Sequence, residues 1–325
     1  MSNIFSGLQQ IIDLFTQFPI AFYISVFIFC VLVGSFLNVV IYRLPIMMQR
    51  DWQQQTIDFF KPELPPSFIK KYTPRGTFNL VKPDSTCPQC QHHIRAWENI
   101  PVLSYLFLKG KCSQCLTAIS IRYPLIELAT GFVGLWTALH FGVSIQTLVL
   151  IVVSFFLISM IMIDCKHLLL PDDLTLGLLW LGLLVAIWDV FIPLPDAIIG
   201  AMLGYLILWS IYWGFKLVTG KDGMGYGDFK LLAALGAFVG WYHLIIVILL
   251  ASIVGLVLGL LIPQITRKLP SNNGSSNQAV PFGPFLGIAG WLTIFYGDTI
   301  QRIYLQWLLG SCLMFLMFRA KQAAE

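Results

Sequence analysis

The chain has 325 residues, of which 57% are apolar and 11% are charged. Soluble domains carry about 25% charged residues, so this composition, with a mean hydropathy of +0.78, excludes an ordinary soluble protein and indicates a membrane protein. A net charge of +4 would suit a nucleic-acid-binding protein. However, membrane topology accounts for the placement of the basic residues, and we expect no nucleic acid as a partner.

Apolar runs long enough to cross a bilayer recur along the chain, since a span needs about 17–25 mostly apolar residues. We expect nine spans, near residues 20–42, 124–141, 144–164, 174–192, 196–216, 229–241, 243–263, 282–297 and 301–318. One long helix over residues 229–263 would reduce the number to eight. The sequence therefore predicts an all-α polytopic membrane protein, a bundle of eight or nine transmembrane helices.

Lysine and arginine indicate the orientation, because they gather on the cytoplasmic side of a membrane. With nine spans and the N-terminus outside, 19 of the 20 basic residues lie inside, and only Arg302 lies outside. Residues 1–15 lack the basic segment and the small-residue cleavage site of a secretory signal. We therefore expect residues 20–42 to be a retained first span.

Polar stretches divide the chain into three predicted parts. Residues 43–123 hold 11 of the 20 basic residues, and we expect them to form a small cytosolic domain inserted between helices 1 and 2. Residues 1–42 contain the first transmembrane segment, and residues 124–325 form a membrane-embedded domain. Within the latter, residues 267–279 are predicted to be a flexible cytoplasmic linker.

Four cysteines of the inserted domain are spaced as two C-x2-C pairs with 21 residues between them: Cys87, Cys90, Cys112 and Cys115. This pattern predicts a tetrahedral zinc site, and four sulfur ligands would close the shell and make the metal structural. Two disulfides or free thiols are the alternatives, although a cytosolic location disfavours disulfides. The adjacent His92 and His93 are expected at the surface.

Two aspartates stand at the cytoplasmic ends of predicted spans. Asp164 ends one apolar run, and Asp228 begins another within the motif Gly225-x-Gly227-Asp228-x-Lys230. Two neighbouring carboxyls cannot both ionise, so one activates water while its protonated partner polarises a peptide carbonyl. The glycines would let an extended peptide approach the backbone. The pattern predicts an aspartyl protease at the membrane edge.

A purely structural role for the aspartates is the simplest alternative. They would then cap helix starts or pair with Lys166 and Lys230, as Asp172 or Asp173 is expected to cap the helix that follows. Asp164 fits this role poorly, because the end of a helix disfavours negative charge.

Several longer motifs, taken together, resemble type IV prepilin peptidases, the GxGD-type bifunctional leader peptidase/N-methyltransferases of bacterial pilus and type II secretion systems. The resemblance runs nearly end to end and covers both cysteine pairs and both aspartate segments. The remaining motifs are GSFLNVVIYRLP at 34–45, NIP at 99–101, RYPLIE at 122–127, LPD at 170–172 and PFGPF at 281–285.

The resemblance implies cleavage of the basic leader of type IV prepilins and pseudopilins after a glycine, at the cytoplasmic face of the bacterial inner membrane. It also implies methylation of the new N-terminal residue with S-adenosylmethionine. By motif, Asp164 and Asp228 correspond to the catalytic pair, and the four cysteines correspond to a zinc site. No residue is assigned to S-adenosylmethionine, for which the cytosolic domain, with Arg122 and Glu127 nearby, is the expected location. Family members usually have eight spans.

Two other functional classes remain open from the residues alone. An ion-coupled membrane transporter would use Asp164 and Asp228 as ion or proton sites, although such sites tend to lie at mid-membrane in broken helices. A structural scaffold of a secretion machine would explain the cysteines but leave the paired aspartates without a role.

Overall fold

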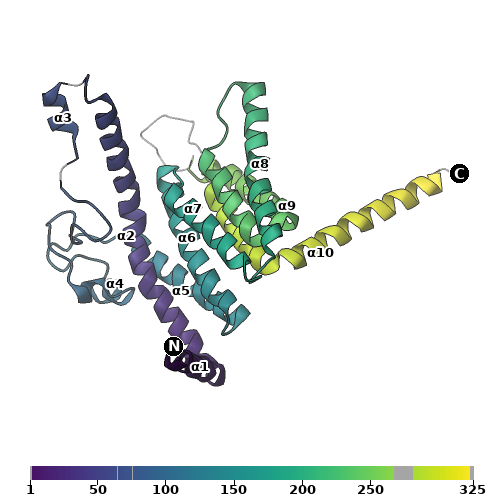
Figure 1. The fold of residues 1–325 in the computed structure, drawn as a ribbon, viewed down its shortest axis with the longest axis horizontal. Coiled ribbons are helices and arrows are strands. Elements are labelled where there is room, and N and C mark those ends of the chain that lie inside the picture. The colour runs from purple at the N-terminus through teal and green to yellow at the C-terminus, as the bar shows by residue number, and fades with distance from the viewer. Residues whose placement is uncertain (1, 64, 75, 267–280, 323–325) are drawn as a thin grey trace. The chain divides into compact units, whose positions relative to one another are not determined.

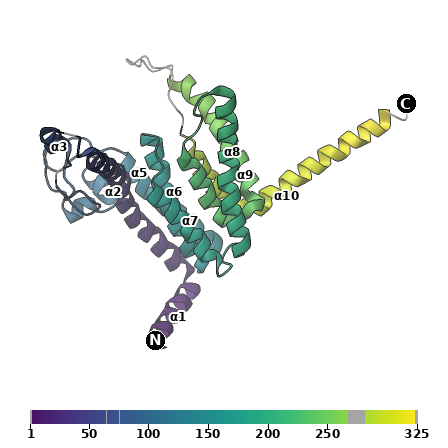
Figure 2. The same cartoon turned by 45° about the horizontal axis from the view of Figure 1, so that its top comes forward.

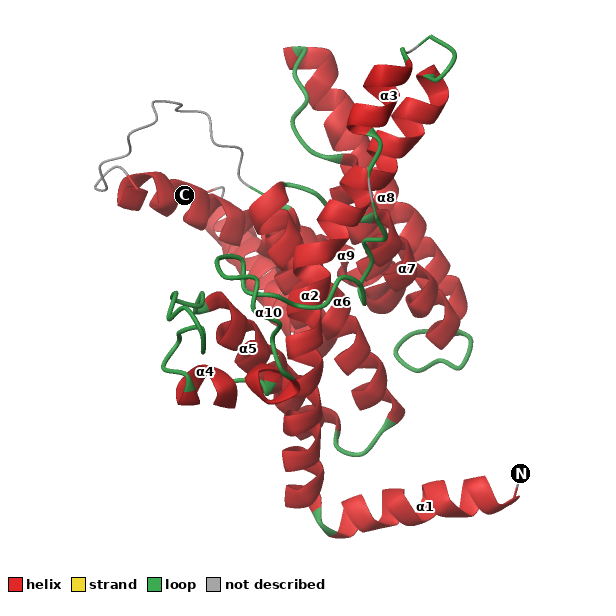
Figure 3. Cartoon of the chain, turned by 90° about the vertical axis from the view of Figure 1, so that its left-hand side faces the viewer, coloured by secondary structure: helices red, strands yellow, loops and turns green. Residues whose placement is uncertain are grey.

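The computed structural model describes residues 2–63, 65–74, 76–266 and 281–322. Every named element in these residues is a helix, and strand-like pairing is limited to the isolated bridges Thr86–His93 and Lys111–Ala118 (Figure 3). The prediction of an all-α chain is therefore confirmed. The predicted linker at residues 267–279 lies outside the described residues.

The helices follow one another along the chain as shown in Figure 1. They are α1 (Ser2–Gln17), α2 (Pro19–Phe60), α3 (Pro66–Tyr72), a 3-10 helix (Ala96–Asn99), α4 (Leu103–Phe107), α5 (Arg122–Phe141), α6 (Ile145–His167), α7 (Asp172–Ala186), α8 (Leu194–Thr219), α9 (Tyr226–Thr266) and α10 (Gly283–Gln322). The chain divides into two compact units, residues 1–167 and 168–325.

Within the described residues, five helices are long and apolar enough to cross a membrane. They are Pro19–Phe60, Arg122–Phe141, Ile145–His167, Leu194–Thr219 and Tyr226–Val257. The sequence-based expectation of several membrane-crossing helices is thus confirmed in this coarser form.

Several expected helix boundaries differ from the structure. α9 holds two predicted spans, and Gly240 interrupts it with φ 72° and ψ 172°, a conformation that glycine adopts without steric cost. The predicted break between residues 297 and 301 is wrong, because α10 continues through it. Asp298 and Arg302 suggested a loop there, but one helical turn accommodates them: the Arg302 side chain donates to the Asp298 carbonyl at 3.2 Å.

α2 is longer than the predicted first span. It passes through Pro45 and ends at Phe60, so residues expected to lie in a loop extend the helix into the polar segment. Proline removes one helical hydrogen bond but does not have to end a helix. α1 precedes it and is set at an angle to it (Figure 2), with a single residue, Phe18, between the two helices.

In the first unit, α2, α5 and α6 pack together. α2 and α5 approach closely where Gly134 faces Cys30, since a Cβ on the glycine would overlap the cysteine sulfur. Leu150 and Val153 of α6 are fully buried. Small residues let helix backbones come close and gain van der Waals contact without a hydrophobic driving force.

In the second unit, α9 packs against α7, α8 and α10. At the α8–α9 crossing, Gly200 and Gly236 face each other, and a Cβ on either would overlap the backbone of the other. Phe229, Leu232 and Leu235 form the fully buried side of α9. The start of α9, which carries Asp228, is therefore held firmly in the core of this unit.

Candidate active site and metal centre

Asp164 lies near the end of α6 in the first unit. Its residue surface is only 6% exposed, whereas the next residue, Cys165, is exposed. The position opposes the helix dipole, which disfavours a carboxylate near a C-terminus. Lys166, considered as a partner of Asp164, has its ammonium 6.0 Å from the centre of the Tyr42 ring. A buried acid at the end of an apolar helix is costly, and such residues are often functional.

Asp228 lies in the first turn of α9 in the second unit, and it is 7% exposed. Its amide donates to the Gly225 carbonyl at 3.2 Å. A Cβ on Gly225 would lie 3.9 Å from the Asp228 Oδ2 atom, so one carboxylate oxygen faces the glycine backbone.

The remaining motif residues brace this turn. A Cβ on Gly227 would lie 2.7 Å from the Leu170 Cβ, so the glycine permits the close packing of two backbones. Lys230, expected to support Asp228, forms its ion pair with Asp172, with 2.6 Å between Nζ and Oδ1. The expectation that Asp172 or Asp173 caps α7 is wrong: both lie in the first turn, and the N-cap residue is Pro171.

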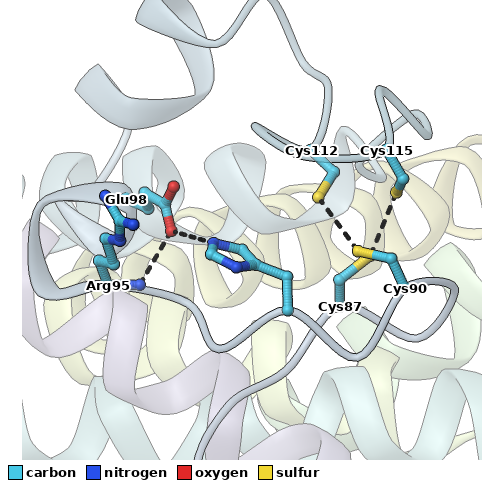
Figure 4. Close-up of polar contacts among 7 residues, drawn as sticks. Cys87, Cys90, Arg95, Glu98, Cys112 and Cys115 are labelled. Atoms are coloured by element: carbon cyan, nitrogen blue, oxygen red, sulfur yellow. Dashed lines mark hydrogen bonds and ion pairs between the residues drawn. The ribbon is translucent and has the colours of Figure 1, made fainter.

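The four cysteine sulfurs of the inserted segment form one cluster, all within 4.8 Å of one another (Figure 4). Cys87 and Cys115 Sγ are 3.7 Å apart, and Cys90 and Cys112 Sγ are 4.0 Å apart. Four sulfurs at about 2.3 Å from a tetrahedral zinc would be about 3.8 Å from one another. The cluster therefore fits such an ion, while disulfides would need about 2.05 Å between sulfurs.

Two nearly identical turns place the sulfurs. In each pair, the backbone carbonyl of the first cysteine accepts a hydrogen bond from the amide of the residue that follows the second cysteine. The backbone amide of the first cysteine donates to the carbonyl of the residue five positions later. The bonds are Gln91 N to Cys87 O (2.9 Å), Cys87 N to His92 O (2.9 Å), Leu116 N to Cys112 O (3.1 Å) and Cys112 N to Thr117 O (2.8 Å). Gln91 and Leu116 share a φ of 57°. The repeated geometry aims two sulfurs from each turn at one point.

Glu98, which the sequence analysis missed, lies beside this cluster (Figure 4). Its side chain is 6% exposed and accepts from the Arg95 amide at 2.9 Å. The Ser113 hydroxyl, followed by the Arg95 amide, holds the pKa of Glu98 below its usual value. Because Ser113 belongs to the second cysteine pair and Arg95 follows the first, the carboxylate connects the two turns.

The two histidines behave differently. His92, expected at the surface, has a side chain only 17% exposed, with Nε2 lying 3.2 Å from the Glu98 carboxylate. His93 is exposed, as expected. The expectation failed for His92 because its partner lies six residues away, across a turn that spacing alone does not reveal.

Two buried charges hold the inserted segment to the apolar helices of the first unit. Arg43, 7% exposed, donates to the carbonyls of Asn79 at 3.0 Å and Pro83 at 2.6 Å. Glu127, also 7% exposed, accepts from the Val102 amide at 2.8 Å. Both residues lie in motifs noted in the sequence, and their contacts indicate a docking role.

A binding place for S-adenosylmethionine does not emerge from the inserted segment. Its described residues contain short helices and two isolated bridges, without the strand and glycine-rich turn of a common nucleotide site. Glu127 is occupied by the docking contact with Val102, and Arg122 is exposed. We assign no residue to the methyl donor.

The fold and these sites define a multi-pass helical membrane protein with a four-cysteine cluster in a polar insertion and two buried aspartates at helix ends. Comparison with known families agrees. Residues 28–141 match the model of the Bacterial Peptidase A24 N-terminal domain, and residues 151–260 match that of the Type IV leader peptidase family. No solved structure matches the chain.

Several curated proteins are similar over nearly the full length. Each is named prepilin leader peptidase/N-methyltransferase. The protein of Stutzerimonas stutzeri is 54% identical over 89% of this chain and 95% of its own length. Those of Pseudomonas aeruginosa and Legionella pneumophila are 48% and 43% identical, over 92% and 90% of this chain and 98% and 97% of theirs. The chain belongs to the type IV leader peptidase family, an aspartic protease family, which favours the protease over the transporter and scaffold alternatives.

Proposed function

We propose that this chain cleaves the leader peptides of type IV prepilins and pseudopilins and then N-methylates the new N-terminal residue, at the cytoplasmic face of the bacterial inner membrane. The observation that carries the proposal is the burial of Asp164 and Asp228 at the ends of apolar helices, in a chain similar to prepilin leader peptidase/N-methyltransferases over about nine-tenths of its length.

In the proposed reaction, one of the two aspartates, Asp164 and Asp228, is ionised and the other is protonated. The ionised carboxylate takes a proton from water, which attacks the carbonyl carbon of the scissile peptide bond, while the protonated partner donates to the carbonyl oxygen. Collapse of the tetrahedral intermediate breaks the C–N bond, and the amine leaves with a proton.

The four-cysteine cluster is proposed to hold a structural zinc ion through Cys87, Cys90, Cys112 and Cys115. Four thiolates leave no open coordination position for water, so the ion would stabilise the inserted segment rather than take part in peptide hydrolysis. S-adenosylmethionine would supply the methyl group for the second reaction. Residues 43–123 are proposed as the cytosolic domain, between a first transmembrane segment in residues 1–42 and a membrane-embedded peptidase domain in residues 124–325.

For the membrane topology, we propose eight crossings. The described apolar segments α2, α5, α6, α7, α8 and α10, with the two parts of α9 on either side of Gly240, number eight. In this arrangement the ends of α6 and α8 and the starts of α7 and α9 face the cytoplasm. Reporter fusions at residue 80 and at the C-terminus should report opposite faces, whereas the same face for both would support nine crossings.

The proposed activities can be tested with purified protein in detergent, mixed with a purified prepilin. Mass spectrometry should find a product cut after the leader glycine, and a further gain of one methyl group on the new N-terminal residue when S-adenosylmethionine is added. An intact prepilin after incubation with folded protein would refute the peptidase. A cleaved but unmethylated product would refute only the second activity.

A further inference from the structure

A polar cluster at the end of α8 lies just before the segment that carries Asp228. Tyr212 donates its hydroxyl proton to the Asp222 carboxylate at 2.6 Å, and the Lys216 ammonium lies 2.9 Å from the same oxygen. Lys216 also donates to the Tyr212 hydroxyl at 3.2 Å. One helical turn thus presents two donors, four residues apart, to one carboxylate in the following loop.

The tyrosine distinguishes this cluster from an ordinary surface ion pair. Lys216 and Asp222 are partly exposed, with side chains 37% and 70% accessible, and such pairs contribute little by themselves. Tyr212, however, is only 4% exposed, and a hydrogen bond from a hydroxyl to a carboxylate is charge-assisted and short. The Tyr212 hydroxyl, followed by Lys216, holds the pKa of Asp222 below its usual value.

Aromatic contacts link the cluster to the start of α9. The Tyr212 ring centroid lies 5.3 Å from that of Tyr226 and 5.6 Å from that of Phe229, the latter being the fully buried neighbour of Asp228. In the loop itself, a Cβ on Gly223 would lie 2.8 Å from the Phe215 ring. The side of α8 that binds Asp222 therefore also contacts Gly223 within the loop and the first turn of α9 that follows the loop.

The loop needs such support because of its composition. The loop between α8 and α9, residues 220–225, contains three glycines, at positions 220, 223 and 225. Glycine loses more conformational freedom on ordering than any other residue, so a segment of this kind holds one conformation only where other groups restrain it. The Asp222 carboxylate bonds the Tyr212 hydroxyl and the Lys216 ammonium of α8, and the Lys221 amide donates to the Thr219 hydroxyl at 3.3 Å.

We propose that Asp222, held by Tyr212 and Lys216, is a positioning residue of the peptidase: it holds loop residues 222–225 in the conformation that presents Asp228, at the start of α9, to the scissile bond. The proposal rests on the proposed function. It assigns no chemical step to Asp222. Loss of the tether would misplace a reacting carboxylate, so the effect should fall on kcat rather than on the folded fraction.

The test compares Tyr212→Phe, Asp222→Asn and Asp222→Glu with wild type, using prepilin cleavage by purified protein. Tyr212→Phe keeps the ring and removes only the hydroxyl. Lys221→Gln is the matched control, because it changes a charge in the same loop outside the cluster. We expect kcat per folded molecule to fall about ten-fold in Tyr212→Phe and at least as much in Asp222→Asn. Asp222→Glu should recover part of the loss, and Lys221→Gln should behave as wild type.

A double variant adds a second criterion. If Tyr212 acts through Asp222, the variant that combines Tyr212→Phe with Asp222→Asn should cleave no more slowly than Asp222→Asn alone. The positioning role would be overturned if Tyr212→Phe and Asp222→Asn had the same kcat as Lys221→Gln. It would also be overturned if these two variants melted at a lower temperature with kcat unchanged. If Asp222→Asn does not fold, the kcat of Tyr212→Phe compared with that of Lys221→Gln decides the outcome. Absence of cleavage by folded wild type would instead overturn the proposed function, and the positioning role with it.

Discussion

Lys230 and Asp172 join the N-terminal parts of α9 and α7 through a contact of 2.6 Å between Nζ and Oδ1. The two residues are 58 positions apart, and each lies close to an element of the candidate site: Lys230 is two residues beyond Asp228, and Asp172 follows the segment in which Leu170 packs on Gly227. The ion pair therefore fixes the helix that carries Asp228 against the segment that follows α6.

Breaking this pair should affect cleavage more than stability. The two side chains are 31% and 57% exposed, and a partly exposed pair is worth less than about 1 kcal/mol. We expect Lys230→Met and Asp172→Asn to keep nearly the wild-type melting temperature while kcat/KM for prepilin cleavage falls by about three- to ten-fold. Asp173→Asn, on the next residue, serves as the control. An equally large loss of kcat/KM in Asp173→Asn would mean that the negative charge at the start of α7, and not the ion pair, supports cleavage.

Zinc content provides a test of the cysteine cluster. The wild-type protein should carry about one zinc ion per chain, because four thiolates form one tetrahedral site. Cys112→Ser should lower this content strongly and expose the inserted segment to protease. Cys165→Ser changes an exposed thiol outside the cluster and should leave the metal content unchanged. Metal analysis of reduced wild-type protein that finds no zinc would rule out this site.

Glu98 should stabilise the inserted segment in a pH-dependent manner. In the folded protein the pKa of Glu98 is below its usual value. Its contribution to folding stability is therefore present at pH values above the usual pKa of a glutamate, and it is lost as the pH falls through the lowered pKa. Glu98→Gln should therefore melt at a lower temperature than wild type at neutral pH. The difference should shrink as the pH is lowered into the acid range; a constant difference would contradict a role for the charge.

Glu127 should anchor the inserted segment through the Val102 amide. Glu127→Ala leaves that amide without its acceptor, at a cost of about 1–3 kcal/mol, whereas Glu127→Gln retains an oxygen that accepts. Thermal unfolding and limited proteolysis should show a clear loss in the first variant and a small one in the second. Glu63→Ala, at an exposed position, controls for loss of a carboxylate. Equal behaviour of both Glu127 variants would argue against this hydrogen bond.

Local patterns in the sequence were sufficient for several features of the sites. The C-x2-C spacing predicted the sulfur cluster because each pair folds as one tight turn. The Gly225-x-Gly227-Asp228 motif marked the start of α9. Such features depend on residues close together in the chain.

Features that depend on distant residues were missed. Nothing in the sequence alone indicates that Glu127 meets the amide of Val102, or that Lys230 pairs with Asp172. Helix ends were also hard to predict. The charged residue Asp298 and the residue Pro45 each suggested the end of a helix, but α10 and α2 continue through them. Hydropathy locates apolar segments, but it does not define where their hydrogen bonds end.

The most direct test of the central claim is cleavage of a purified prepilin by the Asp228→Asn and Asp164→Asn variants, beside wild type and Asp173→Asn. Because one carboxyl cannot act as both base and acid, we expect each of the first two variants to lose cleavage by at least about a thousand-fold. Wild type and Asp173→Asn should cleave, and all four proteins should insert into membranes. Near-wild-type cleavage by either Asp228→Asn or Asp164→Asn would remove that aspartate from the mechanism and contradict the proposed pair.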